Sequence, residues 1–311
     1  MIKNNLFFNI IAFVTVAIWG TTFISSKILL NTLTPIEVMF FRFVIAYFVL
    51  LLLYPKFNKI QSIKEEILFL IAGITSGSLY FLTENTAVKI SLASNVSLIL
   101  ATSPMLTAFL AHFFTKGEKL NKNLVIGFFI AILGVFLVIF NGNFILKLNP
   151  TGDILALGAS LCWAAYSVLS KTFSQKYHTL YLTRKIFFYA IITTFPFLFT
   201  SEFNFSPFKL MIFEVIINLL FLGIIASSIC YVFWSFAIDK LGVIKTNNYL
   251  YFLPLITLIL SVIILHEKIT AFSLTGAILI LLGVYVSEKG FAFNFYKANS
   301  IYNICNNKKK Y

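Results

Sequence analysis

Apolar residues fill most of this chain in long runs, and short polar stretches separate the runs. A helix needs about 20 apolar residues to cross the hydrocarbon core of a bilayer. Runs near that length cover residues 6–30, 36–54, 67–87, 91–114, 124–141, 153–171, 180–200, 212–236, 243–265 and 271–288. The connections between them are too short to fold independently. The pattern therefore predicts an all-α integral membrane protein with ten transmembrane helices.

One long stretch of the chain has a sequence pattern that occurs a second time. The pattern from Pro104 to Val138 returns from Pro254 to Ser287, and in each copy glycines follow nine and sixteen residues after a Glu-Lys pair. Seven residues is close to two helical turns, so each glycine pair lies on one face, where another helix can approach closely. These glycines are Gly127, Gly134, Gly276 and Gly283. We interpret the repeat as a tandem duplication and expect these glycines to be packing contacts.

The two halves also match at their first spans. Trp19 and Lys27 have the same spacing as Trp163 and Lys171. Each half contains five predicted spans, an odd number, so the second half must enter the membrane with opposite polarity. The sequence thus predicts two inverted five-helix repeats, at residues 1–148 and 149–290, and a cytoplasmic tail at 291–311. Both tryptophans lie near mid-helix, where they either line a cavity or pack in the core.

Composition and charge agree with a membrane location. Of 311 residues, 59% are hydrophobic and 11% are charged, against about 25% charged in soluble proteins. The net charge of +13 does not indicate nucleic acid, because the lysines concentrate in alternate connections. By the positive-inside rule, both termini are cytoplasmic in a multi-pass protein of the cytoplasmic membrane. Three cysteines, of which two lie inside spans, make no disulfide framework.

Polar residues inside the spans are candidates for a substrate site. Glu84 is the outstanding one, because an ionisable side chain within a span is costly and usually functional. Tyr80 lies one turn before it on the same face. The full set of candidate substrate-binding residues is Glu84, Tyr80, Asn85, Asn95, Thr102, Trp19, Trp163, Tyr166, Trp234, Asn248 and Tyr251. Two alternatives stay open: a polar residue can simply join helices, and Glu84 can form a fixed ion pair with Lys27 or Arg42.

Prolines interrupt matching spans in the two halves. Pro104 and Pro254 both fall inside apolar runs, and a proline removes one backbone hydrogen bond from a helix. In a membrane the freed carbonyl must find a partner in protein or water. A kink that faces a cavity and a kink that is packed both satisfy this requirement.

These motifs, taken in order, resemble a known family. The segment from Pro35 to Arg42, the segment from Glu84 to Pro104 and the repeated Glu-Lys and glycine block are similar to the EamA-type transporters of the drug/metabolite transporter superfamily. The resemblance covers nearly the whole chain. It implies two inverted halves around a central cavity, alternating access, and amino acids or related metabolites as substrates, more often exported than imported. The second half departs from the pattern, since no proline precedes Arg184 as Pro35 precedes Arg42.

Other functional classes lack their motifs. The histidines are scattered, no HExxH motif occurs, and the two aspartates form no metal motif, so we expect no metal and no cofactor. No nucleotide-binding glycine loop occurs, so an ion gradient, the membrane potential or exchange must drive transport. We expect a small-molecule substrate, a surrounding lipid bilayer, a coupling proton or counter-substrate, no nucleic-acid partner, and a monomer or homodimer. The sequence predicts a secondary transporter and not an enzyme; the alternative is an intramembrane enzyme or lipid-handling scaffold that uses Glu84.

Overall fold

A computed structural model of the chain describes residues 2–59, 62–90, 96, 99–140, 150–199, 206–256, 259 and 270–290. Every element in these ranges is helical. The α-helices are α1 (Ile2–Leu30), α2 (Pro35–Leu53), α3 (Ile63–Gly73), α4 (Leu79–Ile90), α6 (Ser103–Phe114), α7 (Lys122–Phe140), α8 (Pro150–Ser174), α9 (Thr179–Thr194), α10 (Phe213–Leu220), α11 (Cys230–Leu241), α12 (Val243–Asn248) and α14 (Ala271–Lys289). The π segments are η1 (Ile74–Ser78) and η4 (Phe221–Ile229), and the 3₁₀ segments are η2 (Phe195–Phe199), η3 (Pro207–Met211) and η5 (Tyr249–Phe252).

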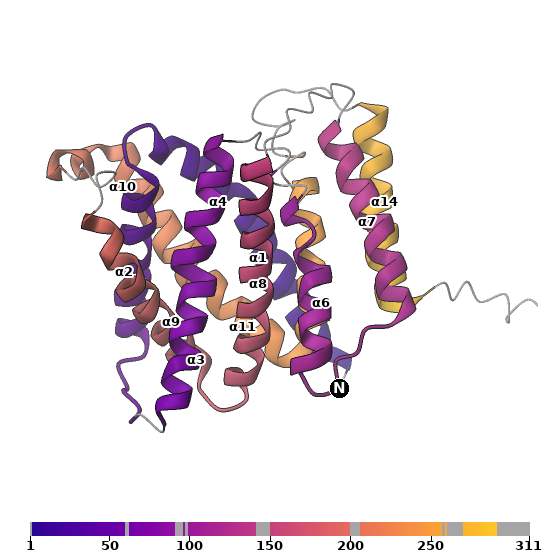
Figure 1. Ribbon diagram of the computed structural model, residues 1–311, viewed down its shortest axis with the longest axis horizontal. Coiled ribbons are helices and arrows are strands. Elements are labelled where there is room, and N and C mark those ends of the chain that lie inside the picture. Colours follow the sequence, from indigo (N-terminus) through magenta and orange to yellow (C-terminus); the bar gives the residue numbers. More distant parts are fainter. Residues whose placement is uncertain are drawn as a thin grey trace, which may run out of the picture.

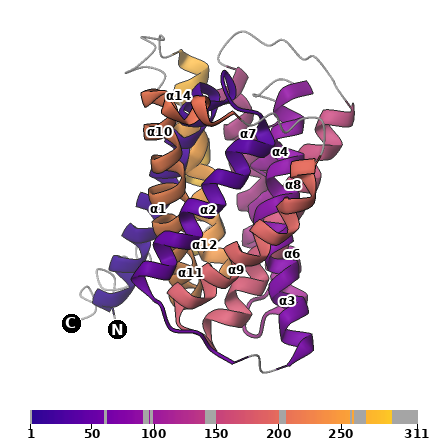
Figure 2. The ribbon, with the colours of Figure 1, turned by 90° about the vertical axis from the view of Figure 1, so that its left-hand side faces the viewer.

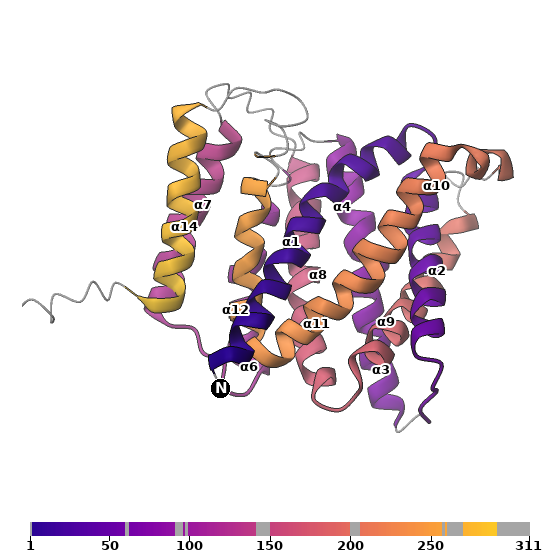
Figure 3. The same ribbon diagram turned by 180° about the vertical axis from the view of Figure 1, so that it is seen from behind.

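The helices form one bundle in which α8 contacts helices of both proposed halves. Figures 1 and 2 show the long helices running side by side. α8 contacts α4, α6 and α11, while α1 lies against α11, as Figure 3 shows from behind. The prediction of an all-α protein is confirmed for the described residues.

Five helical runs in the described ranges are long and apolar enough to cross a membrane. They are Pro35–Leu53, Ile63–Ala87, Pro150–Ser174, Thr179–Phe199 and Phe213–Leu241. Shorter apolar helices occupy Leu6–Thr22, Ser103–Phe114 and Lys122–Val138. The outer surface suits lipid, since Leu52 is 82% exposed and Phe199 78% exposed. The chain is a multi-pass membrane protein, and the full count of ten inverted spans stays a prediction.

Local sequence explains where α2 begins. Pro35 occupies the first turn, where its missing N–H costs no hydrogen bond. The Thr34 hydroxyl accepts from the Glu37 backbone N–H at 3.3 Å, and the Glu37 carboxylate accepts from the Thr34 N–H at 2.7 Å. This reciprocal capping box satisfies two N–H groups at the start of the helix.

Two of the long runs contain a π segment in the middle. η1 connects α3 to α4, and η4 connects α10 to α11. These runs correspond to the third and eighth predicted spans, which occupy equivalent places in the two proposed halves. A π segment widens the helix and disturbs the regular backbone hydrogen-bond ladder, and such segments occur frequently at functional sites. The site described below uses backbone carbonyls from both.

The helix around Pro104 is interrupted as the sequence predicts. Ala101 and Thr102 form a turn, and α6 begins at Ser103 with Pro104 in its first turn. The Ile99 carbonyl accepts from the Thr102 hydroxyl at 2.6 Å and from the Ser160 hydroxyl of α8 at 3.1 Å. Protein groups therefore satisfy the backbone at this break, which is one of the two outcomes expected for it.

The four repeated glycines bring α7 and α14 into backbone contact. A Cβ atom added to Gly127 would lie 2.5 Å from the Gly283 carbonyl oxygen, and one added to Gly134 would lie 2.6 Å from the Gly276 carbonyl oxygen. Gly127 meets Gly283 and Gly134 meets Gly276, so the two helices run antiparallel. Figures 1 and 3 show this pair side by side at one end of the molecule. The prediction that these glycines are packing contacts is confirmed.

Candidate functional site

The centre of the bundle holds a cluster of aromatic rings from four helices. The Trp19 ring of α1 lies 5.2 Å from Trp163 of α8 and 5.0 Å from Trp234 of α11, measured between ring centroids. Trp163 also contacts Tyr80 of α4 at 5.6 Å and Tyr166 at 5.4 Å. Edge-to-face and tilted contacts of this kind are favourable between aromatic rings. The structure thus brings together five of the eleven predicted site residues.

A sixth ring, from a residue that was not predicted, completes this cluster. Tyr231 of α11 lies 5.6 Å from Trp19, 6.1 Å from Trp163 and 5.7 Å from Tyr166 between ring centroids. Its side chain is 2% exposed. We refer to Trp19, Tyr80, Trp163, Tyr166, Tyr231 and Trp234 as the central ring cluster. It joins helices of both proposed halves at one buried place.

The two π segments fix this cluster through their backbones. The Trp19 indole N–H donates to the Ala226 carbonyl of η4 at 3.0 Å, and the Tyr231 hydroxyl donates to the Ser76 carbonyl of η1 at 3.1 Å. Regular α-helical hydrogen bonding leaves few carbonyls for such use, whereas a disturbed ladder leaves some available. The π segments therefore determine where two of the six rings lie.

Asn247 of α12 connects the cluster to polar groups on two other helices. Its side-chain oxygen accepts from the Trp163 indole N–H at 3.0 Å, from the Ser167 hydroxyl at 3.3 Å and from the Thr107 hydroxyl at 3.5 Å. Its side-chain nitrogen donates to the Val243 carbonyl at 2.9 Å. Asn247 is fully buried. A short helix is thereby attached to both α6 and α8 by one amide.

Glu84 lies at the edge of the central ring cluster on α4. Its carboxylate accepts a hydrogen bond from the Tyr80 hydroxyl at 3.2 Å, and the residue is 8% exposed. Among the described residues, no Lys or Arg nitrogen lies within 4.0 Å of this carboxylate. The fixed ion pair with Arg42 is therefore not formed as a direct contact, and the Lys27 side chain lies outside the described residues.

Arg42 of α2 is a buried basic residue that contacts α4, the helix that carries Glu84. Its Nε donates to the Ser227 hydroxyl of η4 at 2.5 Å, and its guanidinium carbon lies 4.4 Å from the centre of the Phe81 ring. Arg42 is 6% exposed, and none of its nitrogens lies within 4.0 Å of the Glu84 carboxylate. Two opposite charges thus lie apart from one another in the interior.

The other buried acidic groups have cationic partners. Glu37 is fully buried, forms the capping box of α2 and lies 3.4 Å from the Lys209 nitrogen. Glu65 is 8% exposed and lies 3.2 Å from the Lys176 nitrogen. The half-buried Glu66 forms an ion pair with Lys185 and accepts from the Tyr189 hydroxyl. These carboxylates stabilise contacts between elements. Glu84 differs from them, because its described partner is a neutral hydroxyl.

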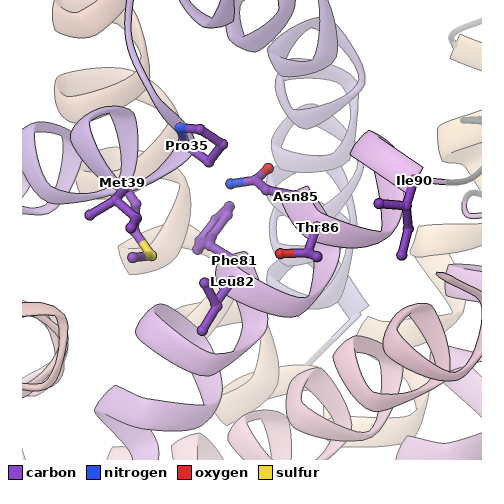
Figure 4. Close-up of a pocket in the computed structure, with 8 residues that line it drawn as sticks. Pro35, Met39, Phe81, Leu82, Asn85, Thr86 and Ile90 are labelled. Atoms are coloured by element: carbon purple, nitrogen blue, oxygen red, sulfur yellow. The ribbon is translucent and has the colours of Figure 1, made fainter. Parts of the chain in front are cut away.

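Asn85 points into a small pocket that is separate from the central ring cluster. The pocket has a volume of about 160 Å³ and is lined by Pro35, Ile36, Met39, Phe81, Leu82, Asn85, Thr86 and Ile90. Figure 4 shows the Asn85 amide directed toward Pro35, with Met39 on the opposite side of the view from Ile90. Asn85 therefore opens onto a different space from its neighbour Glu84, because adjacent helical residues point about 100° apart.

Three further predicted site residues lie elsewhere in the described part of the chain. Thr102 uses its hydroxyl on the nearby Ile99 carbonyl. The Asn248 side chain donates to the Ser287 hydroxyl at 3.1 Å, close to lysines of a second cavity. Tyr251 packs with residues of α7 and α14. Asn95 lies outside the described residues.

Sequence reasoning did not include Arg42, Ser227, Tyr231 and Asn247 in the site. Arg42 carried a usable signal, since an arginine inside a span is as costly as a glutamate. Asn247 is one residue from the predicted Asn248, and one residue rotates a helical side chain by about 100°. Ser227 and Tyr231 gave no signal, because serines and tyrosines are common in such helices.

A membrane bundle whose buried centre holds rings, an amide and two separated opposite charges is suited to binding a small polar solute. Membrane-spanning helices with functional groups in their interior are typical of multi-pass membrane transporters. The chain belongs to the EamA-like transporter family, which it matches over residues 6–140 and 150–288. The resemblance to the drug/metabolite transporter superfamily noted in the sequence is confirmed.

Relatives agree with this assignment. The chain is 31% identical over 281 residues to an uncharacterized transporter of Archaeoglobus fulgidus, covering 88% of this chain and 94% of the relative. It is 24% identical over 293 residues to a probable amino-acid metabolite efflux pump of Escherichia coli, covering 90% and 94%. A solved crystal structure that is 18% identical has the same fold, with a TM-score of 0.73 over 89% of this chain and 95% of that one.

Proposed function

We propose that this transporter moves a small organic metabolite, an amino acid or a related compound, out of the cell across the cytoplasmic membrane. The observation that carries this proposal is Glu84, a carboxylate in the interior whose described hydrogen-bond partner is the Tyr80 hydroxyl. An intramembrane ionisable group without a fixed counter-charge marks a substrate or ion pathway. The similarity to a probable amino-acid metabolite efflux pump supports an amine-bearing substrate and the outward direction.

The proposed mechanism is alternating access between two inverted five-helix halves. In this mechanism the central ring cluster lies between the halves and opens to one side of the membrane at a time. Glu84 then has one of two roles: it takes up and releases a proton during the cycle, or it pairs with the amine of a zwitterionic substrate. The rings exclude water, which strengthens the interaction of Glu84 with any charged group that enters.

The test is solute counterflow in proteoliposomes. Purified protein is reconstituted into vesicles that contain one of the twenty common amino acids, and uptake of the same labelled amino acid is followed. We expect at least one amino acid to exchange faster in protein-containing vesicles than in protein-free ones. Absence of exchange for all twenty, with monodisperse reconstituted protein, would contradict the proposed substrate class.

Glu84→Gln then distinguishes a role in transport from a role in folding. It keeps the shape of the side chain and removes its charge, so transport should be lost while folded yield stays near that of the unmodified protein.

A further inference from the structure

Arg42 has the arrangement of a carboxylate-binding residue. We propose that Arg42 and Glu84 together bind a zwitterion, with the Arg42 guanidinium on the substrate carboxylate and the Glu84 carboxylate on the substrate amine. This inference rests on the proposed function and deepens it, because it names the group on the substrate that each charge recognises. It also makes Arg42 a determinant of specificity.

The guanidinium is held in place by contacts that leave part of it available. Nε donates to the Ser227 hydroxyl at 2.5 Å, and the flat face lies 4.4 Å from the centre of the Phe81 ring. In the described part of the chain, the terminal Nη1 and Nη2 groups donate no hydrogen bond and have no carboxylate oxygen within 4.0 Å. The edge that these two nitrogens form matches the two oxygens of a carboxylate.

Arg184, the corresponding arginine of the second half, differs from Arg42 in the hydrogen bonds of its guanidinium. Both terminal nitrogens of Arg184 donate to backbone carbonyls, one to Tyr54 and the other to Lys56 at 2.7 Å. Its guanidinium also lies 4.5 Å from the Phe57 ring centre. Arg184 therefore uses its donors to hold the chain after α2. Arg42, which is equally buried, holds no such backbone.

Arg42 and Glu84 are related in space through α4. Phe81, which lies under the guanidinium, is one turn before Glu84 on α4, so both charges border the same part of that helix. No nitrogen of Arg42 lies within 4.0 Å of a Glu84 carboxylate oxygen, so the two groups do not form a direct ion pair. A zwitterion inserted between them would make charge-assisted hydrogen bonds of about 2.8 Å at both ends.

The central ring cluster, at whose edge Glu84 lies, contains a buried donor without a described partner. The Trp234 indole N–H is completely buried and has no hydrogen-bond partner within the described ranges. A buried N–H without a partner is costly. A carboxylate can accept about four hydrogen bonds, which is enough for the Arg42 edge and an additional N–H.

Electrostatics favour a zwitterion over a solute with one charge. A solute with only an amine would leave Arg42 unpaired and would be repelled by its positive charge. A solute with only a carboxylate would leave Glu84 unpaired and would be repelled by its negative charge. Rejecting a ligand by leaving a buried charge without a partner is an effective source of specificity. The site therefore selects for both charges on one small molecule.

The experiment compares three probes that share one apolar group. L-phenylalanine has both charges, phenethylamine lacks the carboxylate and 3-phenylpropanoate lacks the amine. Exchange of each labelled probe is measured in proteoliposomes with the unmodified protein, Arg42→Gln, Arg42→Lys and the matched control Arg184→Gln. We expect the unmodified protein to prefer phenylalanine over either analogue by about tenfold or more, the effect typical of one charged hydrogen-bonded contact.

Arg42→Gln should reduce phenylalanine exchange by about tenfold or more and leave phenethylamine exchange equal or higher, because the repelling cation is gone. Arg42→Lys should restore part of the preference. Arg184→Gln is expected to change folded yield but not the ratio between probes. If Arg42 had only a structural role, Arg42→Gln would lower the exchange of all three probes by the same factor.

Two results would overturn the assignment of Arg42. One is an unchanged ratio of phenylalanine to phenethylamine in Arg42→Gln. The other is equal exchange of the two probes by the unmodified protein, a comparison that remains available if the variant does not fold. Failure of the unmodified protein to exchange any of the twenty amino acids would instead defeat the proposed function itself.

Discussion

The Glu118 carboxylate caps the start of α12 by accepting hydrogen bonds from the Val243 and Ile244 backbone N–H groups, the second at 2.9 Å. Glu118 is the glutamate of the repeated Glu-Lys pair, in the connection between α6 and α7, and α12 carries Asn247. The motif of one half therefore fixes the first turn of a helix in the other half. Gly242 allows the close approach, since its φ is +95° and an added Cβ would lie 2.6 Å from the Glu118 Oε1 atom.

Glu118→Ala should destabilise the folded protein by about 1–2 kcal/mol, the usual effect of losing an N-terminal helix cap. Thermal unfolding in detergent measures this as a lower melting temperature. Lys119→Ala is the matched control, because Lys119 belongs to the same motif and makes no contact with the α12 backbone among the described residues. Equal melting temperatures for Glu118→Ala and the unmodified protein would refute the capping role.

Glu84→Gln should abolish transport or remove its dependence on pH, while folded yield remains near normal. The variant keeps the hydrogen-bond geometry to Tyr80 and lacks the charge, which is the property assigned to transport. Counterflow in proteoliposomes between about pH 5 and pH 8 measures both effects, and this range covers the usual titration of a perturbed carboxyl. Glu37→Gln is the contrast. It should lower folded yield, because it breaks a buried ion pair with Lys209. Normal transport by Glu84→Gln across this range would exclude the assignment.

Gly127→Leu and Gly276→Leu should each reduce folded yield. Both would insert a side chain where backbone atoms lie 2.5 Å and 2.6 Å from the added Cβ, and overpacking costs at least about 1–3 kcal/mol. Gly158→Leu is the control, since nothing lies within 4 Å of an added Cβ there. The yield of monodisperse protein, measured by size-exclusion chromatography, is compared among the three variants. A well-folded Gly127→Leu variant with altered substrate preference would contradict a packing role.

Asn247→Leu should lower the melting temperature more than Asn248→Leu. Loss of the Asn247 oxygen leaves donors on Trp163, Ser167 and Thr107 without an acceptor, whereas Asn248 has one described side-chain bond, to Ser287. Interhelical polar contacts in membranes contribute about 1–2 kcal/mol. If the two substitutions have equal effects, Asn247 does not connect the helices as described.

The lysine distribution predicts that Cys305 is cytoplasmic. A membrane-impermeant thiol reagent should leave it unlabelled in intact cells and label it after permeabilisation. The two other cysteines lie in helices, with Cys162 half-buried and Cys230 buried, and Cys305→Ser shows any labelling that they contribute. Labelling of Cys305 in intact cells would reverse the predicted orientation.

Much of the fold could be predicted because lipid imposes simple rules. Every backbone polar group in a membrane needs a partner, so long apolar runs must be helices. The break before Pro104 could be predicted from the same rule. The close helix contacts could be predicted from the seven-residue spacing within each glycine pair, Gly127 with Gly134 and Gly276 with Gly283. These features depend on nearby residues or on a pattern that the chain repeats.

The site was predictable only in part, because it depends on rotation and on distant contacts. The π segments have no distinctive residue types, yet they determine which carbonyls bind Trp19 and Tyr231. Choosing Asn248 over Asn247 required a helix face to be known within one residue. The contact of Arg42 with Ser227 joins positions 185 residues apart, and no local pattern records such a pairing.

The three tryptophans of the central ring cluster are all the tryptophans that the chain contains. Their ring centroids are 5.0 to 6.0 Å apart, so light absorbed by one is shared among the three. Intrinsic tryptophan emission is consequently a built-in optical reporter of this one place, with no background from elsewhere in the molecule. Entry of a solute, or a change in hydration there, can be followed in real time on the unlabelled protein.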